Sequence, residues 1–159
     1  MLTEKLLVVG ISDQKIAHPS DYLITYALGS CVGVCLYDQS KQISGLAHIL
    51  LPKSSDSINK NEVYKFADTA IVALVNAMEK CGGSRKRFVA KIAGGASMFV
   101  NSTINIGERN VEVVKSELHR LNIRLVAEDT GLNYGRTVKF STEDGKMTVT
   151  AIGKVNKVF

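Results

Sequence analysis

Two apolar runs joined by a short polar segment are the feature that most constrains this fold. Residues 32–37 and 43–51 are almost wholly apolar, and residues 38–41 between them are polar. Apolar runs of this length, bounded by turn-forming residues, are typical of buried strands, and a loop of about four residues favours an antiparallel hairpin. Pro52 ends the second run, because proline cannot donate to a sheet ladder.

The hairpin brings together two reactive side chains that are distant in the sequence. Cys31 begins the first strand, after the small-residue turn LGSC at 28–31, and His48 lies near the end of the second. A loop centred near Ser40 places His48 opposite Cys31 or one of its neighbours. Directly opposed residues have Cβ atoms about 5 Å apart, so a thiol and an imidazole can meet there. A register shift of one residue would put them on opposite faces.

The cysteines of this chain do not form a disulfide framework or a metal site. There are three of them, an odd number, and the spacing of Cys31 and Cys35 fits neither a thioredoxin-type dithiol nor a zinc finger. Cys35, inside the strand, and Cys81, at a helix end, are expected to be buried and inert. We therefore expect reduced thiols, no metal and no other cofactor.

Length and charge limit the possible classes. The 159 residues are 45% hydrophobic and 22% charged, which suits a single compact domain over residues 1–159. The apolar runs are too short to cross a membrane and the first ten residues lack signal-peptide features, so we expect a cytoplasmic protein without membrane insertion. The net charge of +5 suits an acidic partner, but no nucleic-acid motif accompanies it, and nucleic acid is not expected to bind.

The rest of the chain predicts more strands and two amphipathic helices. Apolar residues at three- and four-residue intervals predict helices over residues 60–80 and 107–121. The second helix has Val111, Val114, Leu118 and Leu121 on its apolar side. About seven or eight strands are expected, with turns at residues 128–131 and 144–145. The predicted fold class is α/β (α+β): a single layered domain with a mixed, largely antiparallel β-sheet structure and two main amphipathic helices.

Each candidate residue also has an ordinary structural explanation. A buried cysteine is usually a small hydrophobe, a lone histidine on an apolar strand is usually a core residue, and Thr25 would suit any strand. Cys31 differs because it follows Gly29 and Ser30 at a turn, where backbone N–H groups can face a substrate oxygen. His48 is the histidine that a hairpin would carry towards this thiol.

Several motifs, in the same order, give the chain a resemblance to a known family. They are Thr25 and the segments LGSC (28–31), VCLYD (34–38), GLAHILLP (45–52), AKIAGGASMF (90–99), IGERN (106–110) and AEDTGLNYGRTVKF (127–140). Together they resemble CheD, the chemoreceptor glutamine deamidase family of bacterial and archaeal chemotaxis. Leu132 departs from the family pattern, in which a second glycine follows Gly131.

The resemblance implies a catalytic group of Cys31, His48 and Thr25. Cys31 would attack a glutamine carboxamide, His48 would activate the thiol and protonate the ammonia, and Thr25 would orient His48. Pairing with an imidazolium can lower a thiol pKa by several units, so we expect Cys31 to be activated in this way. Backbone N–H groups of residues 28–31 would stabilise the oxyanion, and water would hydrolyse the thioester to glutamate.

The expected substrate contacts are glycine-rich. Gly29, Ser30, Gly94 and Gly95 are predicted to bind substrate, and the loops at 94–99 and 130–136 are predicted to line its groove.

The resemblance also implies partners. These are the methylation-region helices of chemoreceptors, as substrate, and CheC, a phosphatase of the same pathway. Hydrolysis of a glutamate methyl ester is chemically similar and stays open. A non-catalytic chemotaxis adaptor or regulator of CheC, and a generic cysteine hydrolase acting on a small amide, also remain as alternatives.

Overall fold

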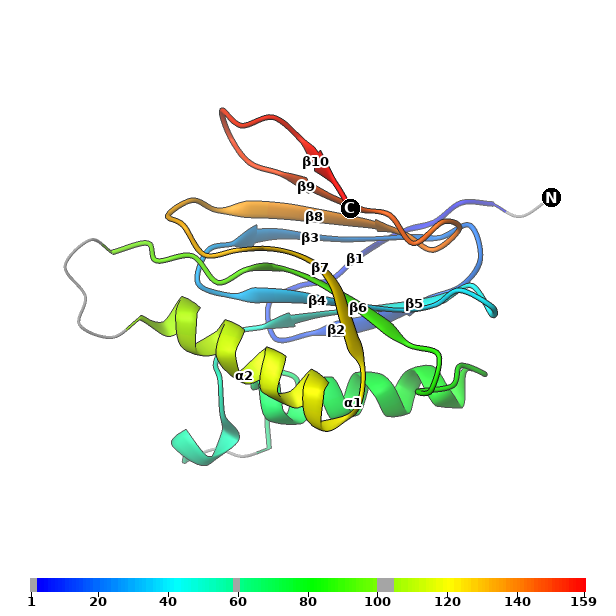
Figure 1. Cartoon of the computed structure of the whole chain (residues 1–159), viewed down its shortest axis with the longest axis horizontal. Helices are drawn as coiled ribbons and strands as arrows, with labels where there is room; N and C mark the ends of the chain where they lie inside the picture. Colours follow the sequence, from blue (N-terminus) through cyan, green and yellow to red (C-terminus); the bar gives the residue numbers. More distant parts are fainter. Residues whose placement is uncertain (1–2, 59–60, 100–104) are drawn as a thin grey trace.

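Two five-stranded sheets and two long helices make up the computed structural model, which describes residues 3–58, 61–99 and 105–159. Figure 1 shows the two sheets lying one above the other, with both helices against the lower sheet. We call the middle layer the inner sheet and the layer far from the helices the outer sheet. This three-layer arrangement confirms the predicted fold class, a layered domain with mixed, largely antiparallel sheets and two helices.

The predicted hairpin forms the centre of the inner sheet. It consists of β4 (Val32–Asp38) and β5 (Ile43–Ile49), and every residue of both strands is buried. The helices cover one face of this hairpin and the outer sheet covers the other, which explains why its strands are continuously apolar. Its register differs from the expected one, because Gly33 rather than Cys31 lies opposite His48.

The inner sheet has the strand order β2-β5-β4-β6-β7. Strands β2 (Gln14–Ala17) and β6 (Val89–Gly94) flank the hairpin as antiparallel neighbours, and β7 (Arg124–Thr130) is parallel to β6. Helix α2 (Ile106–Arg120), which the sequence predicted over residues 107–121, connects β6 to β7. The turn predicted at 128–131 is wrong, because Asp129 and Thr130 continue the ladder with β6.

The outer sheet has the order β1-β3-β8-β9-β10. It contains β1 (Leu6–Val8), β3 (Tyr22–Leu28), the predicted hairpin of β8 (Arg136–Ser141) and β9 (Met147–Thr150), and β10 (Lys157–Val158). A bulge in β3 lies between Thr25 and Leu28. It leaves Tyr26 and Ala27 exposed and returns Leu28 to the buried face.

Two apolar cores fill the spaces between the three layers. The core under the helices includes Val34 of β4, Leu74 of helix α1 (Ala67–Lys80) and Val114 of α2. The core between the sheets includes Cys35 and Phe140. Since successive residues of a strand face opposite sides, the odd-numbered residues of β4 and its entry point towards the outer sheet.

Helix α1 begins at Ala67, later than predicted, after a short 3₁₀ helix at Ser54–Asp56. Residues 59–60 lie outside the described residues. Phe66 is extended, with φ −110° and ψ 140°, and the neighbouring carbonyl of Lys65 accepts hydrogen bonds from the N–H groups of Leu50 and Leu51. Pairing with the end of β5 therefore delays the helix, although the apolar stripe itself packs into the core as predicted.

Candidate active site

Cys31 lies on the bend that enters β4, between the outer and inner sheets, and is 7% exposed. Its carbonyl accepts a hydrogen bond from the N–H of Gly95, and the carbonyl of Gly29 accepts one from Ala96, both at 2.8 Å. Gly94 has φ +113°, and a Cβ at this position would collide with the carbonyl oxygen of Cys31. Gly94 and Gly95 therefore allow the end of β6 to pack directly against the backbone of Cys31.

His48 lies on β5 and is 1% exposed. Its partner across the ladder is Gly33, two residues after Cys31, so Cys31 and His48 share a face as diagonal neighbours. Diagonal neighbours in an antiparallel pair are about 7–8 Å apart, a distance that an imidazole can span. The observed pairing is shifted by one to two residues from the expected one, and the joint action of Cys31 and His48 stays a prediction.

Thr25 belongs to the outer sheet but contacts His48 in the inner sheet. Its hydroxyl oxygen is 2.7 Å from Nδ1 of His48 and 2.7 Å from the carbonyl oxygen of Val9. A carbonyl can only accept, so the single hydroxyl proton of Thr25 goes to Val9. Nδ1 of neutral His48 must then carry a proton and donate it to Thr25. Nε2, which has no hydrogen-bond partner within the described residues, is left as the basic nitrogen.

Burial opposes charge on both reactive groups. Desolvation lowers the pKa of His48 to about 4 and raises the pKa of the Cys31 thiol, although the N–H of Cys31 acts in the opposite direction on the sulfur. Both groups are therefore neutral near pH 7 in the free protein. This differs from the thiolate–imidazolium pair expected from the sequence, because burial favours the neutral form of both groups. A neutral imidazole with a free Nε2 is suited to act as a general base.

The other cysteines and histidines differ from this group in burial. Cys35 also lies two residues from Gly33, on the same face of β4 as Cys31. Cys35 is fully buried, and burial raises its pKa to about 12, as expected of an inert thiol. Cys81, which was expected to be buried, is exposed after the last turn of α1, so that prediction is wrong. His18 and His119 are both exposed.

The four residues predicted to bind substrate fall into two pairs. Gly29 and Ser30 are partly exposed, whereas Gly94 and Gly95 are buried behind Cys31. Contact of any of the four with a substrate stays a prediction. The two loops predicted to line the groove do meet, because the N–H of Gly131 donates to the carbonyl of Gly94 at 2.9 Å.

A groove of about 360 Å³ opens beside the cysteine turn on the side of α2. Ser30 lies at one edge of it, and Leu50, Met98 and Phe99 supply apolar walls. Met98 is 48% exposed and Phe99 is 77% exposed, so large apolar side chains face solvent next to the turn. An apolar part of a substrate could be held here.

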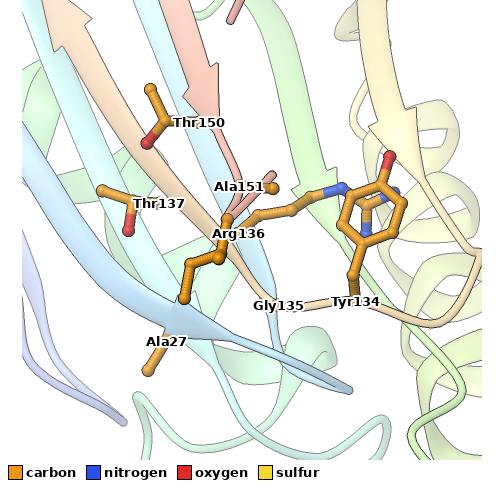
Figure 2. A pocket seen from close by; sticks show the side chains of 8 residues that line it. Ala27, Tyr134, Gly135, Arg136, Thr137, Thr150 and Ala151 are labelled. Carbon is orange, nitrogen blue, oxygen red and sulfur yellow. The ribbon is translucent and has the colours of Figure 1, made fainter. Parts of the chain in front are cut away.

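A second pocket, of about 490 Å³, lies on the outer sheet, between the end of β3, the start of β8 and the end of β9. Figure 2 shows the Arg136 side chain running behind the ring of Tyr134, with Ala27 on the opposite wall. The guanidinium carbon is 4.5 Å from the centre of that ring, and the Arg136 side chain is fully buried. Nη1 donates to the carbonyl of Gly131 at 2.9 Å, and Nε lies 3.5 Å from Oδ2 of Asp129. The guanidinium is therefore held behind the pocket by a ring, a carbonyl and a carboxylate.

Sequence reasoning missed two residues that hold the site. Val9 lies beyond β1, and its role comes from a backbone carbonyl, which leaves no signal in the sequence. Asn110 is buried on α2. The sequence pattern assigned the neighbouring Val111 to the apolar side of this helix, and Val111 does pack against the core. The available signal for Asn110 was a polar residue on the predicted helix, inside the IGERN segment at 106–110.

The described part of the chain shows no group of three or more His, Cys, Asp or Glu side chains placed to hold a metal ion. No described helix combines the length and the apolar character needed to span a membrane.

The fold and the site define an α/β domain with a thiol, an imidazole and a hydroxyl gathered between two sheets. Residues 50–151 match the family model described as CheD chemotactic sensory transduction. The chain belongs to the CheD family.

Curated relatives cover nearly the whole chain. A protein of Lachnoclostridium phytofermentans is 44% identical, covering 96% of this chain and 98% of its own length, and one of Caldanaerobacter subterraneus is 48% identical, with 96% of each chain covered. Both carry the name "Probable chemoreceptor glutamine deamidase CheD". A relative in Methanosarcina acetivorans is 43% identical, with 96% of each chain covered.

A solved structure is similar at the level of the fold. The crystal structure of the hypothetical protein YfiH of Bacillus licheniformis has a TM-score of 0.51, with 14% identity, over 76% of this chain and 51% of that one. At this identity the similarity concerns the fold alone.

Proposed function

We propose that this protein is a chemoreceptor glutamine deamidase that uses Cys31 as its nucleophile. The proposal is supported by the names of relatives that align over almost the full chain. The observation that carries the mechanism is the hydrogen bond from Nδ1 of His48 to Thr25, which leaves Nε2 unprotonated on the face that His48 shares with Cys31.

The first half of the reaction forms a thioester. Nε2 of His48 takes the proton from the Cys31 thiol as the sulfur forms a bond to the carboxamide carbon of a glutamine. The carboxamide oxygen becomes an oxyanion, which the backbone N–H groups of Ser30 and Cys31 stabilise, since the N–H of Gly29 already donates to the carbonyl of Ala27. His48 then gives its proton to the nitrogen, the carbon–nitrogen bond breaks, and ammonia leaves.

The second half returns the enzyme to its starting state. His48 takes a proton from water as the water oxygen attacks the thioester carbon. The carbon–sulfur bond breaks, and the sulfur recovers a proton from His48. The product is glutamate. A neutral resting pair suits this cycle, because proton transfer accompanies each attack and no separated charge has to be buried beforehand.

The substrate proposed here is the methylation region of chemoreceptor helices. The net charge of +5 and the apolar groove beside Ser30 suit an acidic, amphipathic helix. Binding of CheC belongs to the same proposal and can be measured by titrating labelled CheC with the protein.

The test is mass spectrometry of a chemoreceptor cytoplasmic fragment after incubation with the protein. We expect conversion of specific glutamines to glutamate, loss of conversion in Cys31→Ala, and unchanged conversion in Cys81→Ala, which removes an exposed thiol far from the site. Conversion by Cys31→Ala at the wild-type rate would refute the mechanism. Binding of receptor without conversion by the wild-type protein would favour the adaptor alternative.

A further inference from the structure

Asn110 is a fully buried amide that faces both strands of the candidate site. It lies on α2, on the same side as Val114, and is 0% exposed. Its Nδ2 donates hydrogen bonds to the carbonyl oxygens of Ser30, at 2.9 Å, and Leu50, at 3.0 Å. Both partners are carbonyls, so only the NH₂ end of the side chain can face them, which settles the orientation of the amide.

The two carbonyls belong to the segments that carry the cysteine and the histidine. The Ser30 carbonyl is part of the peptide group that ends at the nitrogen of Cys31, and Leu50 follows His48 by two residues. The β4–β5 ladder ends at the pair Val32–Ile49. The amide of Asn110 bridges the next position of the hairpin, where the two strands no longer pair with each other.

The carbonyls of Ser30 and Leu50 each accept a hydrogen bond here, so the side chain at position 110 has to supply two donors. Oδ1 of Asn110 is buried without a partner among the described residues, which is unfavourable in itself. An apolar side chain would avoid that cost but would leave the carbonyls of Ser30 and Leu50 without this donor, and an aspartate would present oxygen to oxygen. The hydrogen bonds to the carbonyls of Ser30 and Leu50 therefore explain why an asparagine occupies this position.

The first turn of α2 packs closely against the segment that follows β6. A Cβ on Gly107 would collide with the carbonyl oxygen of Ala96, so a glycine is needed for α2 to lie this close. Ala96 and Gly95 in turn donate to the carbonyls of Gly29 and Cys31. Helix α2 and the end of β6 thus hold the cysteine turn from two sides.

We infer that Asn110 is a positioning residue for the candidate site: its carboxamide clamps the turn of Cys31 to the end of the strand of His48, so that sulfur and imidazole keep their diagonal relation. This inference rests on the proposed function for its kinetic consequence, but its geometric part can be tested without turnover.

The test compares Asn110→Asp with Val114→Ala in a Cys81→Ser background. Val114→Ala removes packing from the same buried side of α2 and leaves the clamp intact. For Asn110→Asp we expect kcat for deamidation to fall about 10- to 100-fold with little change in KM, because a small displacement of reacting groups has effects of this size. Alkylation of Cys31 by iodoacetamide should become faster, since a loosened turn exposes the thiol. Val114→Ala should lower thermal stability and leave both rates near wild type.

A second readout separates positioning from general damage. A carboxyl group near two carbonyls has a raised pKa and regains one donor when protonated, so the kcat deficit of Asn110→Asp should narrow as the pH is lowered. If Asn110→Asp does not fold, Asn110→Ser, which keeps one hydroxyl donor, takes its place in the same comparison.

Wild-type kcat and wild-type alkylation of Cys31 in a folded Asn110 variant would overturn the inference, as would an equal loss of kcat in Val114→Ala. If the wild-type protein converts no glutamine, the proposed function fails, and the alkylation rates alone decide whether Asn110 positions Cys31.

Discussion

Thr25 in the outer sheet and His48 in the inner sheet are joined by a hydrogen bond of 2.7 Å between Oγ1 and Nδ1. The same hydroxyl donates to the carbonyl of Val9, which directly follows β1, the strand paired with β3. The backbone of one sheet therefore determines which nitrogen of a histidine in the other sheet is basic. Several measurable consequences follow from this bond and from the burial around it.

Removing the hydroxyl of Thr25 should disturb both function and stability. Thr25→Val keeps the shape but leaves Nδ1 of His48 and the carbonyl of Val9 without this partner, which should cost about 1–3 kcal/mol of unfolding free energy. We also expect kcat for deamidation to fall by about tenfold or more, because the orientation and tautomer of the base are lost. Thr25→Ser keeps the hydroxyl and should retain most activity. Chemical denaturation and the receptor-fragment assay measure the two effects, and equal kcat in the two variants would contradict the role given to the hydroxyl.

The buried neutral His48 should make the protein sensitive to acid. Burial lowers its pKa in the folded protein to about 4, from about 6.5 when unfolded, so the unfolded chain binds more protons between these values. The contribution of the neutral His48 to the free energy of unfolding is fully present above pH 6.5. It is lost as the pH falls from 6.5 towards 4, and the total loss is about 3 kcal/mol. Urea unfolding at a series of pH values measures this slope. His48→Gln should flatten it, and an unchanged slope in that variant would assign the acid sensitivity to other groups.

The three cysteines should differ in reactivity in the free protein. Cys81 is exposed, Cys31 is 7% exposed with a raised pKa, and Cys35 is buried with a pKa of about 12. We expect iodoacetamide to label Cys81 first near pH 7, Cys31 more slowly but faster as the pH rises, and Cys35 only on unfolding. Peptide mapping over a pH series gives the order. Rapid labelling of Cys31 at neutral pH, ahead of Cys81, would show that its thiol is activated without substrate.

Leu132 should be replaceable by glycine with a gain in stability. It adopts φ +60° and its side chain is 63% exposed, so a leucine is strained there and contributes little packing. The left-handed conformation costs a residue with a Cβ about 1–2 kcal/mol, of which about 0.5–1 kcal/mol is offset by the greater chain entropy of glycine. Leu132→Gly should therefore raise the unfolding free energy by about 0.5–1 kcal/mol. Leu132→Ala keeps the Cβ and should bring no such gain, so a similar gain in both variants would point to removal of the exposed side chain.

Local patterns predicted most of the secondary structure because they reflect burial. The continuous apolar runs of β4 and β5 arise because both faces of this hairpin are covered, and the periodic stripe of α1 packs on it. Where the prediction failed, pairing between distant segments decided the outcome. Phe66 is held extended by the end of β5, and Asp129 and Thr130 extend β7 along β6. Such pairings depend on neighbours that no local window contains.

The candidate site was likewise predicted from the sequence only in part. Cys31, His48 and Thr25 could be named from the motifs, and the predicted hairpin allowed the first two to meet but left their register open. The neutral resting state of the pair could not be predicted, since desolvation depends on the layers above and below the two side chains. Asn110 and the carbonyl of Val9 were also out of reach, because each acts through backbone groups that are remote in the sequence.

The sequence by itself determined the hairpin, the two helices and the residue types available for chemistry, because apolar periodicity and turn residues act over a few neighbouring positions. Only the tertiary structure decided which nitrogen of His48 is basic, how strongly the thiol resists ionisation and what holds the cysteine turn in place. Those properties depend on hydrogen bonds and on exclusion of water between layers, and both exist only once the two sheets and α2 have packed together.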